Sequence, residues 1–263
     1  MRKDIIERVL NPLLCRKDSI PRQLSVSSQH PGADNSHNTG TTILFMRYKD
    51  GILFAGDRKV SYGGYGIKNQ EMVKIYSISN WTGMAFAGTV SDGQYIKNIL
   101  EQVSGGFTKN YGYPLSIRGQ AQFVRNTLID YKMYVNPCGF EADFLIAGKG
   151  LSGEFEGYEV TGDGCLFECN YCVQGSGTPY AKTHLDDVDR MAKLKKGDMS
   201  LDDAVLTAVG AIFTAAKHDS GSSPIQVALP SVATINDQGF QFMEETKIQE
   251  FVDHLLRKGK PSV

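Results

Sequence analysis

One group of residues in this sequence has the types needed for nucleophilic attack on an acyl group. Gly40-Thr41-Thr42 ends a polar stretch rich in Ser, Asn, Gly and Pro and opens a strand-like run. A threonine hydroxyl is a weak nucleophile at neutral pH and needs a base beside it. If Thr41 were the first residue, its own α-amine could be that base, since an α-amine has an ordinary pKa of about 7.7–8.0. Cleavage before Thr41 would therefore create a nucleophile together with its base.

Further residues with reactive side chains follow at wide intervals along the chain. They are Asp57 in AGDRK, Lys74 in the strand-like run VKIYSI, Ser176 in a G-S-G turn, and Asp219 and Ser222 in KHDSGSS. Each of them alone has an ordinary structural explanation, such as a strand end, a surface lysine or a turn. Their joint order, after a flexible segment that ends in glycine, favours a functional explanation.

In that order and spacing the sequence resembles the proteasome β family and its wider class, the N-terminal-nucleophile hydrolases. The resemblance runs from Thr41 to about Val263 and includes Gly40-Thr41-Thr42, KDG, AGDRK, Ala87-Gly88 and KHDSGSS. The family is cut between the glycine and the first threonine. The resemblance therefore implies that residues 1–40 are a flexible propeptide, removed by autolysis between Gly40 and Thr41, and that residues 41–263 are the catalytic domain.

The resemblance also implies a role for each matching residue. Thr41 is the expected nucleophile, and the charge of Lys74 would favour the neutral α-amine. Asp57 would orient and balance Lys74, while the Gly88 N–H would stabilise the oxyanion, a contact worth about 3–4 kcal/mol in the transition state. Hydrogen bonds from the remaining three residues would hold the amine and a water. The implied catalytic set is Thr41, Asp57, Lys74, Gly88, Ser176, Asp219 and Ser222.

A specificity pocket follows from the same resemblance. Val60, Met72, Phe86 and Val90 would line the pocket that receives the side chain before the scissile bond. All four are apolar, so burial of an apolar substrate side chain should be favoured. We expect cleavage after hydrophobic residues rather than after acidic or basic ones.

The function implied is that of a threonine endopeptidase that degrades unfolded polypeptides inside a closed chamber. Its expected partners are other β-subunits in a ring, expected to be heptameric, together with α-subunit rings and an ATP-dependent unfoldase. Two alternatives stay open: a peptidase like HslV, and a non-catalytic structural ring subunit. The long propeptide and the C-terminal hairpin and helix favour the proteasome, and the complete residue set favours a catalytic subunit.

A different chemistry is suggested by three cysteines. Cys165, Cys169 and Cys172 have the spacing of the cluster motif in radical enzymes that use S-adenosylmethionine, in which three thiolates bind an iron–sulfur cluster. Here the motif falls within a strand-like run, FECNYCVQG. Cys169 and Cys172 differ by an odd number, so on one strand they would face opposite sides. We therefore predict no cluster and no other cofactor.

The elements that must position these residues come as groups of strands that alternate with groups of helices along the chain. The patterns predict strands at 41–48, 51–57, 73–78, 82–88, 143–150, 154–160, 165–169 and 171–175, and a hairpin over 231–243 that turns at 237–239. They predict helices over 91–103, about 114–134, from Thr178-Pro179, after the Ser200 cap, and about 245–258. A short helix over 3–10 is also expected. The order predicts an α+β fold, a four-layer αββα sandwich with two antiparallel sheets between helical layers. This is the N-terminal-nucleophile hydrolase fold that the resemblance implies.

Composition limits the remaining function classes. The 263 residues carry a formal net charge of −1, which argues against nucleic acid as a partner. No run of 18 apolar residues exists, so no membrane span is predicted. The N-terminus lacks the pattern of a signal peptide, and the odd number of cysteines, 5, suggests reduced thiols; both favour the cytoplasm. The histidines (His30, His37, His184, His218 and His254) share no ligand spacing, so no metal site is predicted.

Overall fold

The computed structural model describes residues 40–61, 67–69, 71–186, 188–223 and 228–258. Apart from Gly40, the expected propeptide lies outside these residues, as does the helix predicted over 3–10. The domain boundary before Thr41 therefore stays a prediction.

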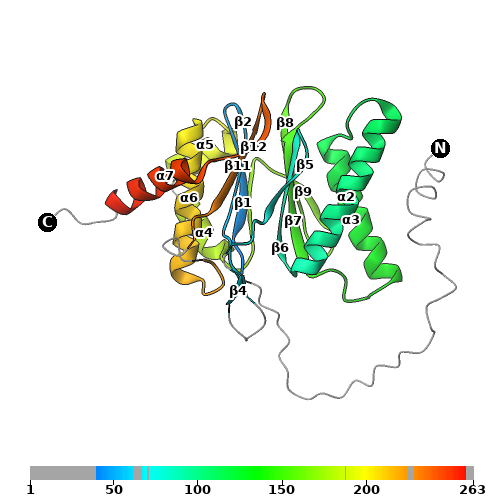
Figure 1. The fold of residues 1–263 in the computed structure, drawn as a ribbon, viewed down its shortest axis with the longest axis horizontal. Coiled ribbons are helices and arrows are strands. Elements are labelled where there is room, and N and C mark those ends of the chain that lie inside the picture. The colour runs from blue at the N-terminus through cyan, green and yellow to red at the C-terminus, as the bar shows by residue number, and fades with distance from the viewer. Residues whose placement is uncertain (1–39, 62–66, 70, 187, 224–227, 259–263) are drawn as a thin grey trace, which may run out of the picture. The chain divides into compact units, whose positions relative to one another are not determined.

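Two five-stranded antiparallel sheets form the centre of the fold (Figure 1). The first has the order β10-β1-β2-β11-β12, and the second has the order β5-β6-β7-β8-β9. The first sheet contains β1 (Ile43–Tyr48), β2 (Gly51–Gly56), β10 (Tyr171–Gln174), β11 (Ser231–Asn236) and β12 (Gly239–Phe242). The second contains β5 (Ile75–Ser79), β6 (Thr82–Gly88), β7 (Ala142–Lys149), β8 (Phe155–Val160) and β9 (Leu166–Glu168).

Strand β1 shows why its sequence is apolar at nearly every position. Successive side chains of a strand point to opposite faces of the sheet. Ile43 and Phe45 belong to the core between the two sheets, which also contains Leu145 of β7. Leu44 and Met46 belong to the core under the helices of the first sheet. Both faces are therefore buried, and full burial of each such side chain contributes about 1.5–3 kcal/mol.

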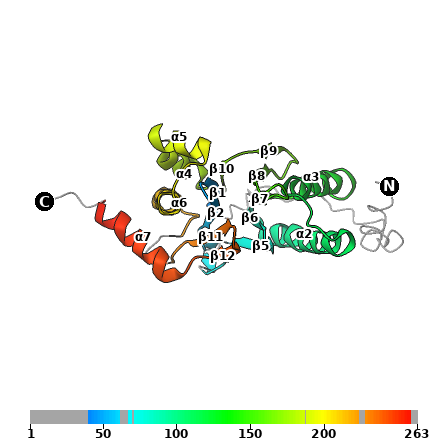
Figure 2. The ribbon, with the colours of Figure 1, turned by 90° about the horizontal axis from the view of Figure 1, so that it is seen from above.

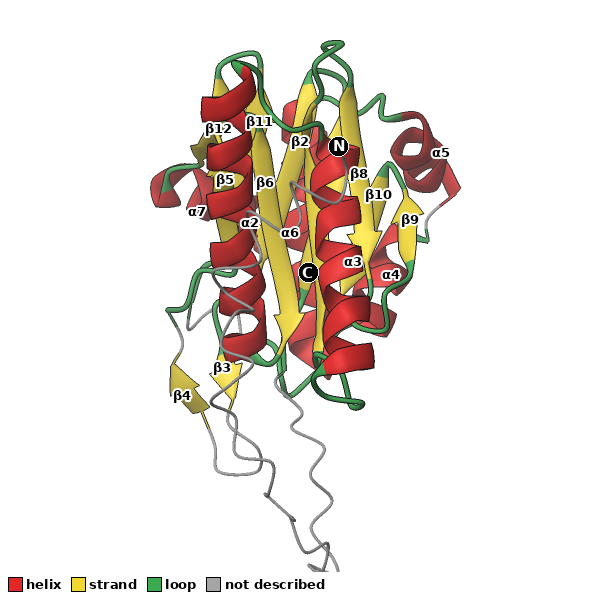
Figure 3. Cartoon of the chain, turned by 90° about the vertical axis from the view of Figure 1, so that its right-hand side faces the viewer, coloured by secondary structure: helices red, strands yellow, loops and turns green. Residues whose placement is uncertain are grey.

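Helices cover the outer face of each sheet, as Figure 2 shows from above. Helices α2 (Val90–Tyr111) and α3 (Ile117–Tyr134) lie over the second sheet (Figure 3). Helices α4 (Thr178–Leu185), α5 (Val188–Lys196), α6 (Leu201–His218) and α7 (Glu245–Lys258) lie on the side of the first. The predicted four-layer αββα sandwich is confirmed.

Helix α2 differs from its prediction, and three further elements were not predicted. Helix α2 runs well past residue 103, through the glycines at 105 and 106. It ends at Gly112, whose φ of 77° is left-handed and suits glycine. Helix α5 and the short pair β3 (Val60–Ser61) and β4 (Ile67–Asn69) were not predicted. Among residues 190–196 of α5, whose side chains the structure describes, only Leu194 is fully buried, so the apolar periodicity there is weak.

No single helix in the described ranges is both long and apolar enough to cross a membrane. Residues 190–196 and helix α6 pass that test only when taken together, across a bend of 117°. Half of the residues of α6 belong to the buried core of the sandwich.

Candidate active site

Thr41 lies at the start of β1, where its hydroxyl meets a buried lysine. Lys74, directly before β5, is 3% exposed, and Thr41 is 4% exposed. The Lys74 Nζ atom donates to Thr41 Oγ1 over 2.9 Å and to Asp57 Oδ1 over 2.8 Å. Pairing of β1 with β2 brings Asp57 here, because Asp57 follows the last residue of β2. The ammonium therefore bridges the hydroxyl and the carboxylate.

The Asp57 carboxylate is 1% exposed and fully supplied with donors. Besides Lys74, its Oδ1 accepts from the Thr42 N–H over 2.8 Å. Its Oδ2 accepts from the Lys59 N–H over 3.0 Å and from the Ser223 N–H over 3.2 Å. A buried charge of this kind is tolerated because it is both paired and hydrogen-bonded.

Lys74 is held in a setting that weakens its hold on a proton. Burial lowers the pKa of Lys74 below the ordinary lysine value, because an ammonium loses its hydration on leaving water. The charge and hydrogen bond of Asp57 oppose this shift, and the more distant Asp219 also opposes it. The positive charge of Lys59 acts in the same direction as burial.

A second carboxylate organises the other side of Thr41. Asp219 caps the C-terminus of α6, and its Oδ2 accepts from the Ser176 hydroxyl over 2.6 Å and from the Ser222 hydroxyl over 2.8 Å. The Thr41 N–H donates to Ser176 Oγ over 3.2 Å. Ser222 Oγ also lies 2.6 Å from Thr42 Oγ1. Thr41 is thus held through its hydroxyl by one network and through its nitrogen by another.

Gly88 ends β6 at a position that only glycine can occupy. Its φ is 120°, and a Cβ there would lie 2.1 Å from the Glu141 carbonyl oxygen. Gly88 lines a small cavity together with Thr41 and Lys74. The four residues predicted for the specificity pocket, Val60, Met72, Phe86 and Val90, line this same cavity.

Phe86 is the large side chain in that cavity, and its ring is fixed from two sides. It stacks on Tyr76 with the ring centroids 5.5 Å apart. Gly93 of α2 lies against the other side, where a Cβ would be only 2.1 Å from the ring. Close packing of α2 on β6 therefore sets the wall of the cavity.

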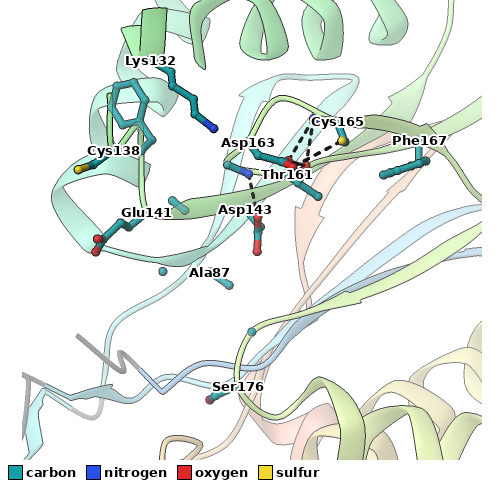
Figure 4. Close-up of a pocket in the computed structure, with 15 residues that line it drawn as sticks. Ala87, Lys132, Cys138, Glu141, Asp143, Thr161, Asp163, Cys165, Phe167 and Ser176 are labelled. Atoms are coloured by element: carbon teal, nitrogen blue, oxygen red, sulfur yellow. Dashed lines mark hydrogen bonds between the residues drawn. The ribbon is translucent and has the colours of Figure 1, made fainter. Parts of the chain in front are cut away.

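A second cavity, of about 670 Å³, has a largely different lining (Figure 4). It shares Gly88 with the small cavity and is also lined by Ser176. Figure 4 shows Asp143 and Asp163 across the opening from Ser176. Sequence reasoning missed this region, because its residues come from the start of β7 and the β8–β9 loop, which carry no local motif.

The two aspartates in this cavity have opposite electrostatic settings. Burial raises the pKa of Asp143, and the charges of Glu159 and Asp163 add to that effect, while the Gly162 N–H opposes it. Asp163 is exposed, and hydrogen bonds from the Thr161 hydroxyl and the Cys165 N–H lower its pKa. The cavity therefore holds one carboxylate that resists ionisation beside another that favours it.

Backbone contacts around Thr41 also escaped sequence reasoning. A Cβ on Gly40 would lie 1.7 Å from the Gly221 Cα, so the two backbones touch. Gly175, with φ of 106°, leaves room for the Thr41 carbonyl oxygen, which a Cβ would approach to 2.1 Å. The Thr-Thr pair was the available signal for Thr42, whose N–H binds Asp57. The glycine contacts had no such signal.

Cys165 and Cys169 flank β9, and Cys172 lies in β10. No group of three or more His, Cys, Asp or Glu side chains in the part of the chain that the structure describes could hold a metal ion. The prediction that Cys169 and Cys172 face opposite sides is wrong, since both side chains belong to the core between the two sheets. It assumed one unbroken strand, but β9 ends at Glu168 and β10 begins at Tyr171, with a bend at Asn170.

Comparison with known proteins agrees with this geometry. The profile of the proteasome subunit family matches residues 37–229. Proteasome subunit beta 1 of Streptomyces avermitilis is 30% identical over 228 residues, which cover 83% of this chain and 77% of that protein. Proteasome subunit beta 2 of Saccharolobus solfataricus is 31% identical over 213 residues, 80% of this chain and 93% of that protein. Proteasome subunit beta 1 of Hyperthermus butylicus is 31% identical over a match that covers 71% of this chain and 86% of that protein. The chain belongs to the proteasome β-subunit family.

Proposed function

We propose that this chain is a threonine endopeptidase whose nucleophile is Thr41 after removal of residues 1–40. Proteasome β-subunits are peptidases that assemble with other proteasome subunits. One observation carries the proposal for this member: the Thr41 hydroxyl accepts a 2.9 Å hydrogen bond from a buried lysine that is itself paired with Asp57. A buried lysine, carboxylate and hydroxyl in series are costly to maintain for structure alone.

In the proposed reaction the α-amine of the mature Thr41 takes the hydroxyl proton while Oγ1 attacks a peptide carbonyl. The nearby Lys74 ammonium favours the neutral, basic form of that amine and stabilises negative charge on Oγ1. The Gly88 N–H is the candidate donor to the carbonyl oxygen as it becomes an oxyanion. The amine then gives its proton to the departing amino group, which leaves an ester on Thr41. Water hydrolyses that ester and restores the hydroxyl.

Activation is proposed to use the same hydroxyl. In the full-length chain the Thr41 nitrogen is an amide bonded to Gly40, so it cannot act as a base. Attack of Thr41 Oγ1 on the Gly40 carbonyl would break the C–N bond, form an ester and free the amine. Water would then release residues 1–40. The Thr41 N–H to Ser176 contact, 3.2 Å long, supports this assignment because Ser176 touches the bond that breaks.

The proposal also includes how the chain assembles and which substrates it degrades. A heptameric β-ring stacked against α-subunit rings, fed by an ATP-dependent unfoldase, would confine the site to unfolded polypeptides. A structural ring subunit and a peptidase like HslV are the competing assignments. The complete set around Thr41 favours a catalytic subunit over a structural one, because a purely structural role does not require it.

Intact mass and covalent labelling of assembled particles test the proposal. We expect the wild-type subunit to begin at Thr41 and to take up one threonine-directed inhibitor there. Thr41→Ala should keep its leader and hydrolyse no peptide, whereas Thr41→Ser should be processed at least in part. Thr207→Ala, at a buried position in α6, is the matched control and should mature normally. Maturation of Thr41→Ala to a chain beginning at residue 41, without another protease, would contradict self-cleavage.

The apolar cavity gives the proposal a specificity test. Cleavage of a peptide library should occur after hydrophobic residues, because Val60, Met72, Phe86 and Val90 line the space beside Thr41. A library in which cuts after Arg, Lys or Glu dominate would assign this cavity another role.

A further inference from the structure

Cys169 and Cys172 lie at the point where the chain passes from one sheet to the other. Strand β9 is an edge strand of the second sheet, and β10 is an edge strand of the first. The sequence between them is a C-x-x-C motif, Cys169-Asn170-Tyr171-Cys172. Its ends are fixed in both sheets, because the Cys169 N–H donates to Gly157 O and Cys172 pairs with Phe45.

Both cysteine side chains belong to the core between the two sheets. The bend at Asn170 turns the chain so that Cys169 packs against the core that contains Cys172. Cys172 is buried, whereas Cys169 is partly exposed. Cys169 is thus the side chain that a small oxidant can reach, and Cys172 is buried in the same core.

We propose that Cys169 and Cys172 are a modification site, at which hydrogen peroxide converts the thiol pair into an intramolecular disulfide across the crossover between the sheets. In the first step the Cys169 sulfur attacks one peroxide oxygen, forming a sulfenic acid and releasing the other oxygen as hydroxide, which takes the thiol proton to become water. In the second step the Cys172 sulfur attacks the sulfenic sulfur. The S–O bond breaks, and hydroxide leaves with the Cys172 proton as water. Two thiols are oxidised, and one peroxide is reduced to two waters.

The surroundings of the two sulfurs decide which one reacts first with peroxide. Interaction with the Cys169 side chain, and after it burial, raises the pKa of Cys172, so this thiol keeps its proton. The partly exposed Cys169 is therefore the sulfur that reacts first, and Cys172 resolves the sulfenic acid.

The other described cysteines do not offer such a pair. Cys165 is exposed, and its sulfur lies 3.7 Å from Asp163 Oδ2. Cys138 is also exposed and lies across the large cavity from Cys165 (Figure 4). Neither has a neighbouring thiol in the described residues to resolve a sulfenic acid.

Peptide mapping of the full chain tests the proposal without any measurement of peptidase activity. Purified protein is treated with hydrogen peroxide, alkylated, and cleaved after glutamate. The cut after Glu168 leaves Cys165 on one peptide and Cys169 with Cys172 on the next. We expect the second peptide to lose both alkylation sites and to regain them after treatment with dithiothreitol.

Variants then assign the two steps. Cys172→Ser, and Cys172→Ala if the serine variant folds poorly, should stall at a Cys169 sulfenic acid that a dimedone probe traps. Cys169→Ser should form no disulfide, while Cys138→Ser should behave as wild type. Three results would overturn the proposal: a disulfide that includes Cys165, oxidation of Cys169 in the wild type that stops short of a disulfide, or full alkylation after peroxide treatment.

Discussion

The two carboxylates beside Thr41 differ in what they bind. Asp57 receives an ammonium and three backbone N–H groups, and it is almost completely buried. Asp219 receives two hydroxyls and the Gly221 N–H. Asp57 is therefore the partner of a buried positive charge, whereas Asp219 fixes the rotation of hydroxyl groups.

This difference teaches which part of the site depends on charge balance and which on orientation. A buried charge that loses its partner is costly to the whole fold. A hydroxyl that loses its acceptor can rotate to another partner, so the cost is smaller and more local. Substitutions on the two sides should therefore affect stability and turnover in different proportions.

The largest effect is expected for Asp57→Ala. The Lys74 ammonium and three backbone N–H groups would lose their acceptor, and the free energy of unfolding should fall by about 3–5 kcal/mol. Urea denaturation measures it. Asp237→Ala is the control, because the Lys149–Asp237 pair is 2.8 Å long but its carboxylate is 84% exposed, and such pairs are worth about 0–1 kcal/mol. Equal losses of stability in the two variants would show that the buried Asp57 network is no more costly to break than the exposed Lys149–Asp237 pair.

Lys74→Ala should reduce turnover strongly while the particle still assembles. Asp57 would keep three N–H donors, so the loss of stability should be smaller than for Asp57→Ala. The basicity of the Thr41 amine would no longer be tuned, and peptide hydrolysis should fall by roughly 10²–10⁴-fold. Lys97→Ala, in a surface pair with Glu101 on α2, is the control. Near-normal turnover in a correctly matured ring would contradict the role given to Lys74.

Asp219→Asn should have an intermediate effect on turnover and a small one on stability. The amide can still accept from one hydroxyl, but the bonds lose their charge assistance, which costs about 1 kcal/mol each. We expect roughly tenfold slower hydrolysis, since 1.4 kcal/mol corresponds to tenfold. Ser222→Ala should cost less, because Ser176 keeps its bond to Asp219. A stability loss as large as that of Asp57→Ala would show that Asp219 is also a charge partner.

The smallest effect is a difference in pH dependence between the wild type and Lys74→Met. The folded-state pKa of Lys74 lies below its ordinary value of 10.5, so between the two values the unfolded chain binds more protons. The stability of the wild type should therefore rise with pH through that window relative to Lys74→Met. Tyrosines with raised pKa values, such as Tyr48 and Tyr76, are present in both chains and cancel in the difference. Urea midpoints between pH 7 and pH 10 test this, and parallel curves would argue against the lowered pKa.

Much of the fold could be predicted because its strands are apolar on both faces and their lengths are short. The runs at 82–88 and 245–258 match β6 and α7 as observed. The helix over 188–196 could not be predicted, because among its described side chains, 190–196, only that of Leu194 is completely buried. The end of α2 was also mistaken, because the helix continues through the glycines at 105 and 106, and such residues weaken a helix by only about 1 kcal/mol each.

The candidate site could be predicted from the order of its motifs along the chain, and not from any single local motif. Asp57 follows β2 of the first sheet and Lys74 precedes β5 of the second. They meet Thr41 only through pairing of β1 with β2 and packing of the two sheets, so the resemblance was needed to connect them. The Asp143 side of the large cavity had no such guide. The bend at Asn170 falls at the break between the strands predicted at 165–169 and 171–175.

The contact between Gly40 and Gly221 has a consequence for anyone who expresses this protein with a different leader. A side chain at residue 40 would push on Gly221, whose N–H is bound to Asp219 Oδ1 over 3.0 Å. Strain at the Gly40–Thr41 junction would thus reach Asp219, which accepts the hydrogen bond of Ser176. A fusion tag can replace the residues before the junction, but its last residue must remain glycine for the site to keep its shape.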